Sequence, residues 1–198
     1  STDGDYQIHA TATDIVGRQS STGTLSITID AAAPVVTIVR PLAGNYNTSL
    51  LFVNITAVDP HVDSTWFYNG TANTTYTGAG NYNFAEGATS VVAYANDTAG
   101  NLGTSAAVAI LVDTIDPTIQ FVAPTPASGS YTTAQVINVT AADANLANIT
   151  IYNGTTALVT CVASPCSYTL STDGDYQIHA TATDIVGRQS STGTLSIT

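Results

Sequence analysis

The chain has 198 residues, 44% of them apolar, and a formal net charge of -11 with only three basic residues, all of them arginine. The apolar content is sufficient for one or two packed cores. Because such an acidic surface repels nucleic acids and anionic lipid, we predict that the protein binds neither partner.

About a quarter of the residues are serine or threonine, whereas charged residues make up only 9%. This neutral, hydroxyl-rich composition favours an extracellular or cell-surface location over a cytoplasmic enzyme. No apolar run approaches the roughly 18 residues that a membrane helix needs, and no basic and apolar leader opens the chain. We expect any signal or anchor of the full protein to lie outside this sequence.

The first 28 residues, Ser1–Thr28, recur letter for letter as Ser171–Thr198, which gives a period of 170 residues. A second, diverged repeat lies inside this period. LFVNITAVD at Leu51–Asp59 matches QVINVTAAD at Gln135–Asp143, 84 residues later. We therefore predict a tandem array, with homologous domains at 29–112 and 113–198 and with 1–28 as the C-terminal half of a preceding domain.

The segments between turn signals are short, alternating and rich in Val, Ile, Thr and Tyr, which is typical of β-strands with one buried face. In the first complete domain we predict strands at Val35–Arg40, Leu51–Val58, Thr65–Tyr68, Ala88–Asn96 and Ser105–Val112. In the second we predict strands at Thr118–Val122, Gln135–Ala142, Asn148–Tyr152, Leu158–Cys161, Asp175–Thr183 and Thr192–Thr198. Such closely spaced strands predict an all-β sandwich.

Residue parity within these strands predicts the core. If Val53, Ile55 and Ala57 point inward, their neighbours Asn54 and Thr56 face water. The homologous strand then buries Ile137, Val139 and Ala141.

The pattern A-x-A-x-D-x-x-G precedes a final strand at Ala93–Gly100 and at Ala180–Gly187, and DTIDP at Asp113–Pro117 follows the strand after the first of these. In these features the chain resembles the tandem immunoglobulin-like (Ig-like) repeats of bacterial and archaeal cell-surface and extracellular filament proteins. The resemblance implies β-sandwich domains stacked end to end, and it implies no particular binding activity. The second copy departs from the family at Arg188, where Asn101 of the sister domain keeps the usual residue.

Short linkers that end in proline, at 29–34 and 113–117, predict a semi-rigid connection between domains. Ser1–Thr28 corresponds to the last strands of a sandwich without the first ones. Alone, this pair would expose an apolar face and sheet edges. We expect a preceding copy of residues 118–170, in the same polypeptide or in a neighbouring subunit, to complete it. The predicted partners are thus identical repeats or subunits.

Eight of the thirteen asparagines begin N-x-S/T, whereas about three would do so by chance at this Ser and Thr content. The excess predicts N-linked glycans. The alternative is that the Asn-Gly pairs simply make hairpin turns followed by strand threonines. The candidate sites are Asn47, Asn54, Asn69, Asn73, Asn96, Asn138, Asn148 and Asn153.

Cys161 and Cys166 enclose four residues, and no other cysteine is present to complete a zinc site. We predict a disulfide that closes a tight turn, which requires an oxidising compartment. A reduced pair in a cytoplasmic protein is the alternative.

Aspartates are expected to gather where the chain enters each sandwich. Carboxylates clustered at a domain joint could bind calcium, which accepts six to eight oxygen ligands in loose geometry. The simpler interpretation is that these aspartates cap turns through backbone amides. Calcium is accordingly the one metal cofactor that we consider, with Asp30, Asp59, Asp97, Asp113, Asp116, Asp143 and Asp184 as its candidate ligands.

No catalytic constellation is recognisable. His9 and His179 have strand parity opposite to the core isoleucines, and His61 has no histidine or cysteine neighbour in the sequence. We therefore predict no enzyme. The expected function is that of a structural repeat in a glycosylated filament, stalk or surface layer. The alternatives are the spacer or ligand-binding region of a cell-surface adhesin and an accessory domain of a hydrolase.

Overall fold

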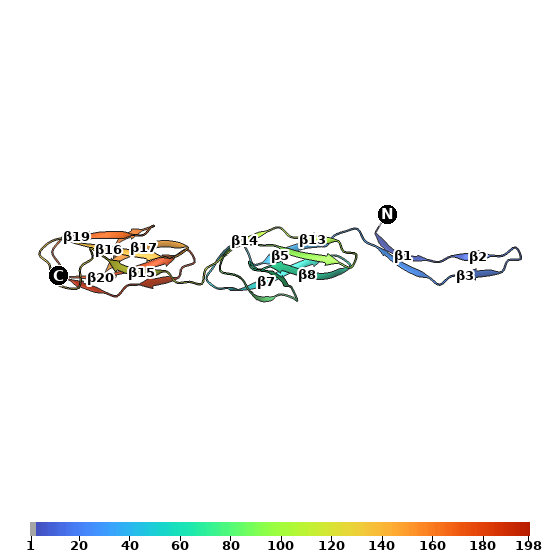
Figure 1. The fold of residues 1–198 in the computed structure, drawn as a ribbon, viewed down its shortest axis with the longest axis horizontal. Helices are drawn as coiled ribbons and strands as arrows, with labels where there is room; N and C mark the ends of the chain where they lie inside the picture. The colour runs from blue at the N-terminus through green and yellow to red at the C-terminus, as the bar shows by residue number, and fades with distance from the viewer. Residues whose placement is uncertain (1–2) are drawn as a thin grey trace. The chain divides into compact units, whose positions relative to one another are not determined.

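The computed structural model describes residues 3–198, and within them it contains β-strands and no helix (Figure 1). The predicted all-β class is confirmed. The chain divides into two compact units. Unit 1 comprises the residues through Ala43 together with Leu50–Ile110, and unit 2 comprises Gly44–Ser49 together with Leu111–Thr198.

The N-terminal part of unit 1 is a two-stranded ribbon, which we call the N-terminal ribbon and define as residues 3–29. Strand β1 (Gly4–Ile8) pairs with β4 (Leu25–Ile29), and β2 (Thr11–Thr13) pairs with β3 (Gln19–Ser21). A tight turn with Gly17 at a φ of 84° joins β2 to β3, which is a conformation that glycine adopts without strain.

Residues 35–112, which we call the first domain, form three sheets. One has the order β10-β7-β5, with β5 at Val35–Arg40, β7 at Leu50–Val58 and β10 at Gly80–Asn83. The second has the order β13-β12-β8-β9, with β8 at Val62–Tyr68, β9 at Asn73–Thr75, β12 at Ala93–Asp97 and β13 at Leu102–Thr104. The third joins β11 (Gly87–Val91), β14 (Val108–Val112) and β6 (Gly44–Tyr46).

The core of this domain follows the predicted parity. Val53 and Ile55 of β7 are buried, and Thr56 between Ile55 and Ala57 is exposed. Phe67 of β8 is fully buried and makes an edge contact with Tyr82, at 5.2 Å between ring centroids. The buried aromatic of the third predicted strand is therefore Phe67 and not its half-buried neighbour Trp66.

Unit 2 is a sandwich of two sheets. The smaller has the order β15-β16-β19, with β15 at Thr118–Val122, β16 at Gln135–Ala142 and β19 at Cys166–Leu170. The larger has the order β18-β17-β20-β21, with β22 also paired to β20. Its strands are β17 (Leu146–Asn153), β18 (Thr156–Cys161), β20 (Tyr176–Asp184), β21 (Gln189–Ser191) and β22 (Leu195–Ile197).

Two long strands predicted in the first domain differ in the structure. The segment predicted as Ala88–Asn96 is interrupted at Val92, so that β11 and β12 belong to different sheets. The segment predicted as Ser105–Val112 contains only β14, which begins three residues later than predicted, and the unpredicted strand β13 precedes it in a different sheet. The chain thus crosses between sheets within a run of strand-forming residues, and the apolar pattern alone does not mark such a crossing.

Gly103 lies where β13 passes close to the start of β5. A Cβ atom at this position would lie 1.9 Å from the carbonyl oxygen of Pro34, so only glycine fits without moving the backbone.

Candidate assembly surface and carboxylate clusters

The N-terminal ribbon has the same internal pairing as its identical sequence in unit 2. Tyr6 faces Ile27 across β1 and β4, as Tyr176 faces Ile197 across β20 and β22. The end turn is also the same, because the Asp14 carboxylate accepts hydrogen bonds from two backbone amides just as Asp184 does. One sequence thus adopts one local structure at both places.

The two copies differ in burial. Ile8 is 51% exposed, whereas the equivalent Ile178 is 0% exposed. Ile27 is 38% exposed, whereas Ile197 is 3% exposed. The alanines between them follow the same contrast, since Ala180 and Ala182 of unit 2 are fully buried and their N-terminal counterparts are exposed. The ribbon therefore presents to solvent the face that forms a core in unit 2.

Strand β17 covers the edge of β20 in unit 2. The two strands pair along their length, from Leu146 opposite Asp184 to Asn153 opposite Ile178. The face is covered by a core cluster that includes Ile137, Ile149 and Leu170. In the described structure β1 pairs with β4 alone. The N-terminal ribbon thus carries both an open strand edge and an open apolar face, which natural proteins normally cover.

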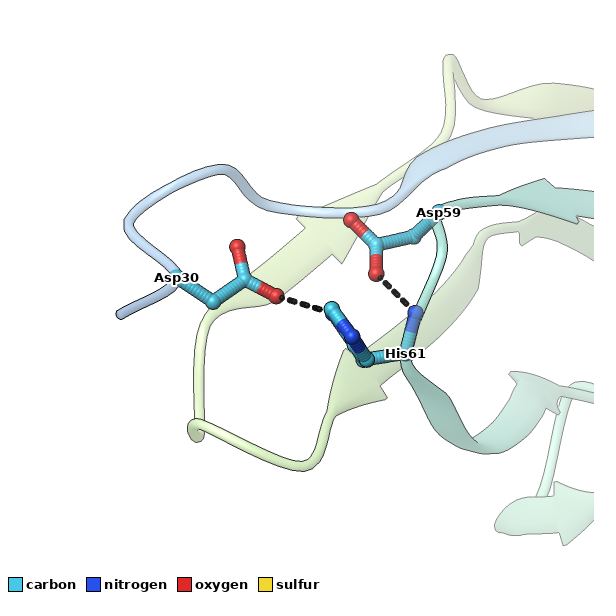
Figure 2. A group of neighbouring side chains, drawn as sticks. All are labelled: Asp30, Asp59 and His61. Atoms are coloured by element: carbon cyan, nitrogen blue, oxygen red, sulfur yellow. Dashed lines mark hydrogen bonds and ion pairs between the residues drawn. The ribbon is translucent and has the colours of Figure 1, made fainter. Parts of the chain in front are cut away.

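A first group of carboxylates lies in unit 1 (Figure 2). His61 Nδ1 lies 3.0 Å from Asp30 Oδ2, and the backbone amide of His61 donates to Asp59 Oδ1 at 2.7 Å. One potential ligand atom from each of these three residues lies within 4.8 Å of the others. Asp30 and Asp59 therefore lie close together as predicted. His61, for which the sequence offered no histidine or cysteine neighbour, lies beside them.

Asp97, the third candidate of unit 1, is buried and held by hydrogen bonds. Its Oδ1 accepts from the backbone amides of Ala99 and Asn101 at 2.9 Å, and its Oδ2 accepts from Asn101 Nδ2 at 2.8 Å. Burial raises the pKa of this carboxyl, but the hydrogen bonds from Asn101, Ala99 and Gly100 outweigh it and hold the pKa below its usual value. Both oxygens therefore have donors.

A second group of carboxylates occupies the corresponding place in unit 2. Asp113, Asp143 and Asp184 each offer an oxygen within 4.8 Å of the others. Asp113 and Asp184 are each only 2% exposed. Asn145 stands where unit 1 has His61, and its Nδ2 donates to Asp113 Oδ2 at 2.8 Å. The Oδ2 atom of Asp184 is buried and has no hydrogen-bond partner.

Arg188 explains this difference between the units. It occupies the position of Asn101, but its guanidinium group does not donate to the aspartate of the turn. Instead Nε lies 2.7 Å from Asp116 Oδ1, and Nη1 donates to the carbonyl oxygen of Asn47 at 3.4 Å. Asp116 is therefore an ion-pair partner and lies outside the group of three carboxylates.

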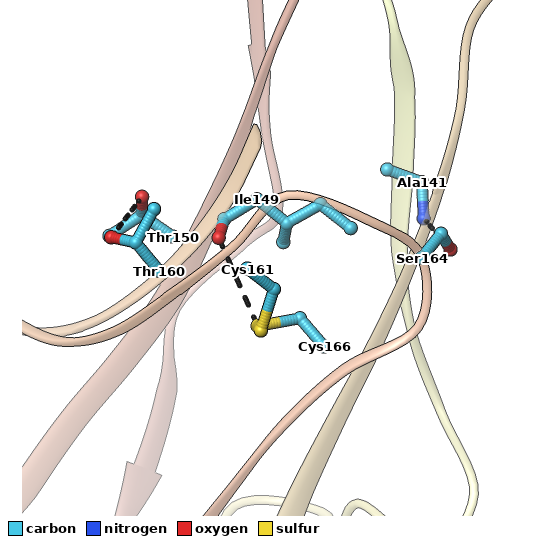
Figure 3. The surroundings of a disulfide bond; sticks show 7 residues. All are labelled: Ala141, Ile149, Thr150, Thr160, Cys161, Ser164 and Cys166. Carbon is cyan, nitrogen blue, oxygen red and sulfur yellow. Dashed lines mark hydrogen bonds between the residues drawn. A yellow bond between two sulfur atoms is a disulfide. The ribbon is translucent and has the colours of Figure 1, made fainter. Parts of the chain in front are cut away.

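The turn between β18 and β19 carries a disulfide between Cys161 and Cys166 (Figure 3). Because β18 belongs to one sheet and β19 to the other, this bond links the two layers of unit 2. Cys166 is fully buried, and its Sγ lies 3.9 Å from the carbonyl oxygen of Ile149. That contact is a van der Waals contact, because a disulfide sulfur has no proton to donate.

None of the eight candidate glycosylation asparagines is buried. Asn47 and Asn73 are exposed, and the other six are half-buried. The side-chain amides of Asn69 and Asn138 donate to backbone carbonyl oxygens, at 3.2 Å in both cases. Because Asn47 and Asn73 are exposed, they are the most accessible acceptors.

The histidine of β20 has a structural role. His179 is half-buried and stacks on Tyr152, with 5.0 Å between ring centroids, while His9 of the N-terminal ribbon is exposed. The sequence reasoning missed Asn145 and Asn101, which follow an aspartate by two and four positions and donate to the carboxylates around them. The signal that could have identified them is the exchange at these positions between the two diverged repeats, where His61 matches Asn145 and Arg188 matches Asn101.

Comparison with solved structures shows an Ig-like β-sandwich fold. It is similar to the eight N-terminal Ig domains of the Down Syndrome Cell Adhesion Molecule, with a TM-score of 0.52 and 12% identity over 94% of this chain and 34% of that one. It is also similar to Sidekick-1 Ig domains 1–4, with a TM-score of 0.50 and 14% identity over 99% of this chain and 58% of that one.

A third similar structure is that of Drosophila OTK extracellular domains 3–5, with a TM-score of 0.50 and 12% identity over 99% of this chain and 71% of that one. At these identities the likeness shows the fold. No protein-family model and no curated protein matches the sequence. No helix among residues 3–198 is long and apolar enough to cross a membrane.

Proposed function

We propose that this chain is a structural repeat unit of an extracellular, N-glycosylated filament, stalk or surface layer. One observation carries the proposal. Residues 173–198 form the buried half of a complete sandwich in unit 2, and the identical residues 3–28 form an uncovered ribbon. A ribbon that already has its final pairing needs only the complementary strands of another unit.

The balance of strands identifies those complementary strands. Residues 1–198 contain two copies of the ribbon and one segment, 113–170, that covers it. Each 170-residue period supplies one of each. The N-terminal ribbon is therefore the end of a preceding unit and takes β15 to β19 of that unit, in the same polypeptide or in a neighbouring subunit.

Repetition of one unit favours a spacer or filament, because such a protein needs equal modules. The spacer of a cell-surface adhesin also needs equal modules. Because domains of adhesion molecules are among the similar structures, an adhesin spacer is the alternative function. A ligand-binding head would require a divergent binding surface, and none of the clusters described above supplies one.

Whether β15 to β19 can cover the N-terminal ribbon can be tested in the full chain. The test weakens the identical ribbon of unit 2, which competes for the same strands. Ile178→Asp places a charge in the core of unit 2 and disables the internal ribbon. The strands β15 to β19 are then expected to take the intact N-terminal ribbon of another copy after refolding. Because each chain has one donor and one acceptor at different places, the contact is head-to-tail and gives chains or rings.

Sedimentation velocity at about 100 µM measures the outcome. We expect the wild-type protein and the Ile8→Asp variant to be monomers. We expect Ile178→Asp to form a series of oligomers. The double variant Ile8→Asp/Ile178→Asp is expected to be a monomer with an unfolded unit 2. The proposal is wrong if Ile178→Asp stays monomeric while the double variant behaves identically.

N-glycosylation is tested on the protein from its native source. The intact mass is measured before and after enzymatic or chemical release of N-glycans. A mass decrease that maps to peptides containing Asn47 or Asn73 is expected, because these side chains are the most exposed. An unchanged mass would remove glycosylation from the proposal and leave the assembly of strands untouched.

A further inference from the structure

The carboxylates Asp113, Asp143 and Asp184 combine short separations with deep burial. Their closest oxygens lie within 4.8 Å of one another, and two of the three side chains are 2% exposed. Neither the pair of His61 with Asp30 nor the ion pair of Arg188 with Asp116 involves any of these three carboxylates. Buried carboxylates require a compensating charge or donors, because they have lost their hydration.

The backbone of unit 2 supplies part of this compensation. Asp184 Oδ1 accepts from the amides of Val186 and Arg188, and Asp143 Oδ1 accepts from the amide of Asn145. These bonds define the turns. They leave the Oδ2 atom of Asp184 buried without a partner, and an ionised oxygen that has lost its hydration is costly to bury without a donor.

Unit 1 provides an internal control, because its turn aspartate Asp97, the counterpart of Asp184, has a donor for each oxygen. Asn101 donates its side-chain amide to Asp97 Oδ2, and His61 lies against Asp30 Oδ2. Unit 2 has replaced these two residues by Arg188, which turns away to Asp116, and by Asn145. The loss of a donor in unit 2 alone indicates that something else neutralises its carboxylates.

We infer that Asp113, Asp143 and Asp184 form a binding site for a divalent cation, and that calcium is the ion that it takes. The three side chains offer oxygen ligands only, which hard cations prefer, and no thiolate or imidazole that would favour zinc. Calcium tolerates the irregular geometry of a turn-lined site, whereas magnesium requires near-octahedral ligands. The site lies wholly within unit 2. The corresponding group of unit 1 includes the imidazole of His61, and the turn aspartate of unit 1, Asp97, has a donor for each oxygen.

The experiment titrates CaCl2 into the metal-free full chain and measures the heat. We expect one site per chain with a Kd of about 0.1–1 mM, which is the range of extracellular modules. Asp143→Asn keeps the cap for the Asn145 amide and removes one charge, so it is expected to weaken binding by at least about tenfold. Asp59→Asn, the same change in unit 1, is the matched control and is expected to bind calcium as the wild type does.

Arg188→Asn gives the sharper test because it restores the residue that unit 1 uses. The new amide is expected to donate to Asp184 Oδ2 and to weaken calcium binding at least about tenfold in a protein that stays folded. Asp116→Asn breaks the same ion pair without offering that amide, so its affinity is expected to remain unchanged. The inference is overturned if the wild type shows no saturable calcium binding up to 20 mM, which is roughly twenty times the weakest Kd expected. It is also overturned if calcium binding is removed by Asp59→Asn and not by Asp143→Asn, or if Arg188→Asn binds calcium as tightly as the wild type.

Discussion

Truncation of the same isoleucine in the two identical ribbons is expected to have very different costs. Ile178 is fully buried between β17 and the smaller sheet, so Ile178→Ala removes core volume and is expected to destabilise unit 2 by about 2–5 kcal/mol. Ile8 is 51% exposed. Full burial of such a side chain stabilises by about 1.5–3 kcal/mol, so Ile8→Ala is expected to cost about 1 kcal/mol or less.

Hydrogen exchange of the β17 amides, followed by mass spectrometry at about 1 µM protein, measures this difference. Ile178→Ala is expected to accelerate exchange in Leu146–Asn153 by about 30-fold or more, since 1.36 kcal/mol corresponds to tenfold. Ile8→Ala is expected to leave those amides unchanged. Equal acceleration by both substitutions would refute the conclusion that the N-terminal ribbon lacks a covering layer in the isolated chain.

Three further outcomes are expected. Gly103→Ala should destabilise the first domain by about 3 kcal/mol or more, because the new Cβ atom would meet the Pro34 carbonyl oxygen. The midpoint of urea unfolding, followed by Trp66 fluorescence, measures this loss of stability. An unchanged midpoint would contradict the close approach. Reduction of Cys161–Cys166 by a phosphine should cost unit 2 about 2 kcal/mol, as expected for so short a loop, without moving the Trp66 transition. Because hydrogen bonds hold the pKa of Asp97 below its usual value, this group stabilises the fold above about pH 4 and the stabilisation is lost as pH falls through the lowered pKa. Asp97→Asn should therefore flatten the acid side of the Trp66 stability curve, and an identical curve would show that this carboxyl is not responsible.

Alternation of apolar residues was sufficient to predict the core strands. Val53, Ile55, Ile137 and Val139 are buried as their parity requires, because a strand with one covered face must place every second side chain inward. The strands that the sequence did not reveal include β9 and β10, which contain asparagine, threonine and glycine and are held by their neighbours. Their strand conformation depends on pairing partners distant in the sequence, and local propensity does not report it.

The carboxylate groups show the same limit at the level of a site. Topology was enough to predict that Asp30 and Asp59 meet in one unit and that Asp113, Asp143 and Asp184 meet in the other. The exchange of Asn101 for Arg188 was visible in the sequence, but its consequence was not. It depends on the direction of one guanidinium group, which bonds Asp116 and leaves a carboxylate oxygen without a donor.

The identity of the two ribbons also bears on how an array of the proposed kind would be synthesised. Each set of covering strands leaves the ribosome before its own ribbon and accepts either copy equally well, since the two sequences are the same. The next identical ribbon follows 170 residues later, which is about 10–30 s of translation. The diverged domain between them therefore acts as a timer: it separates two interchangeable partners by long enough for each sandwich to close on its own strands.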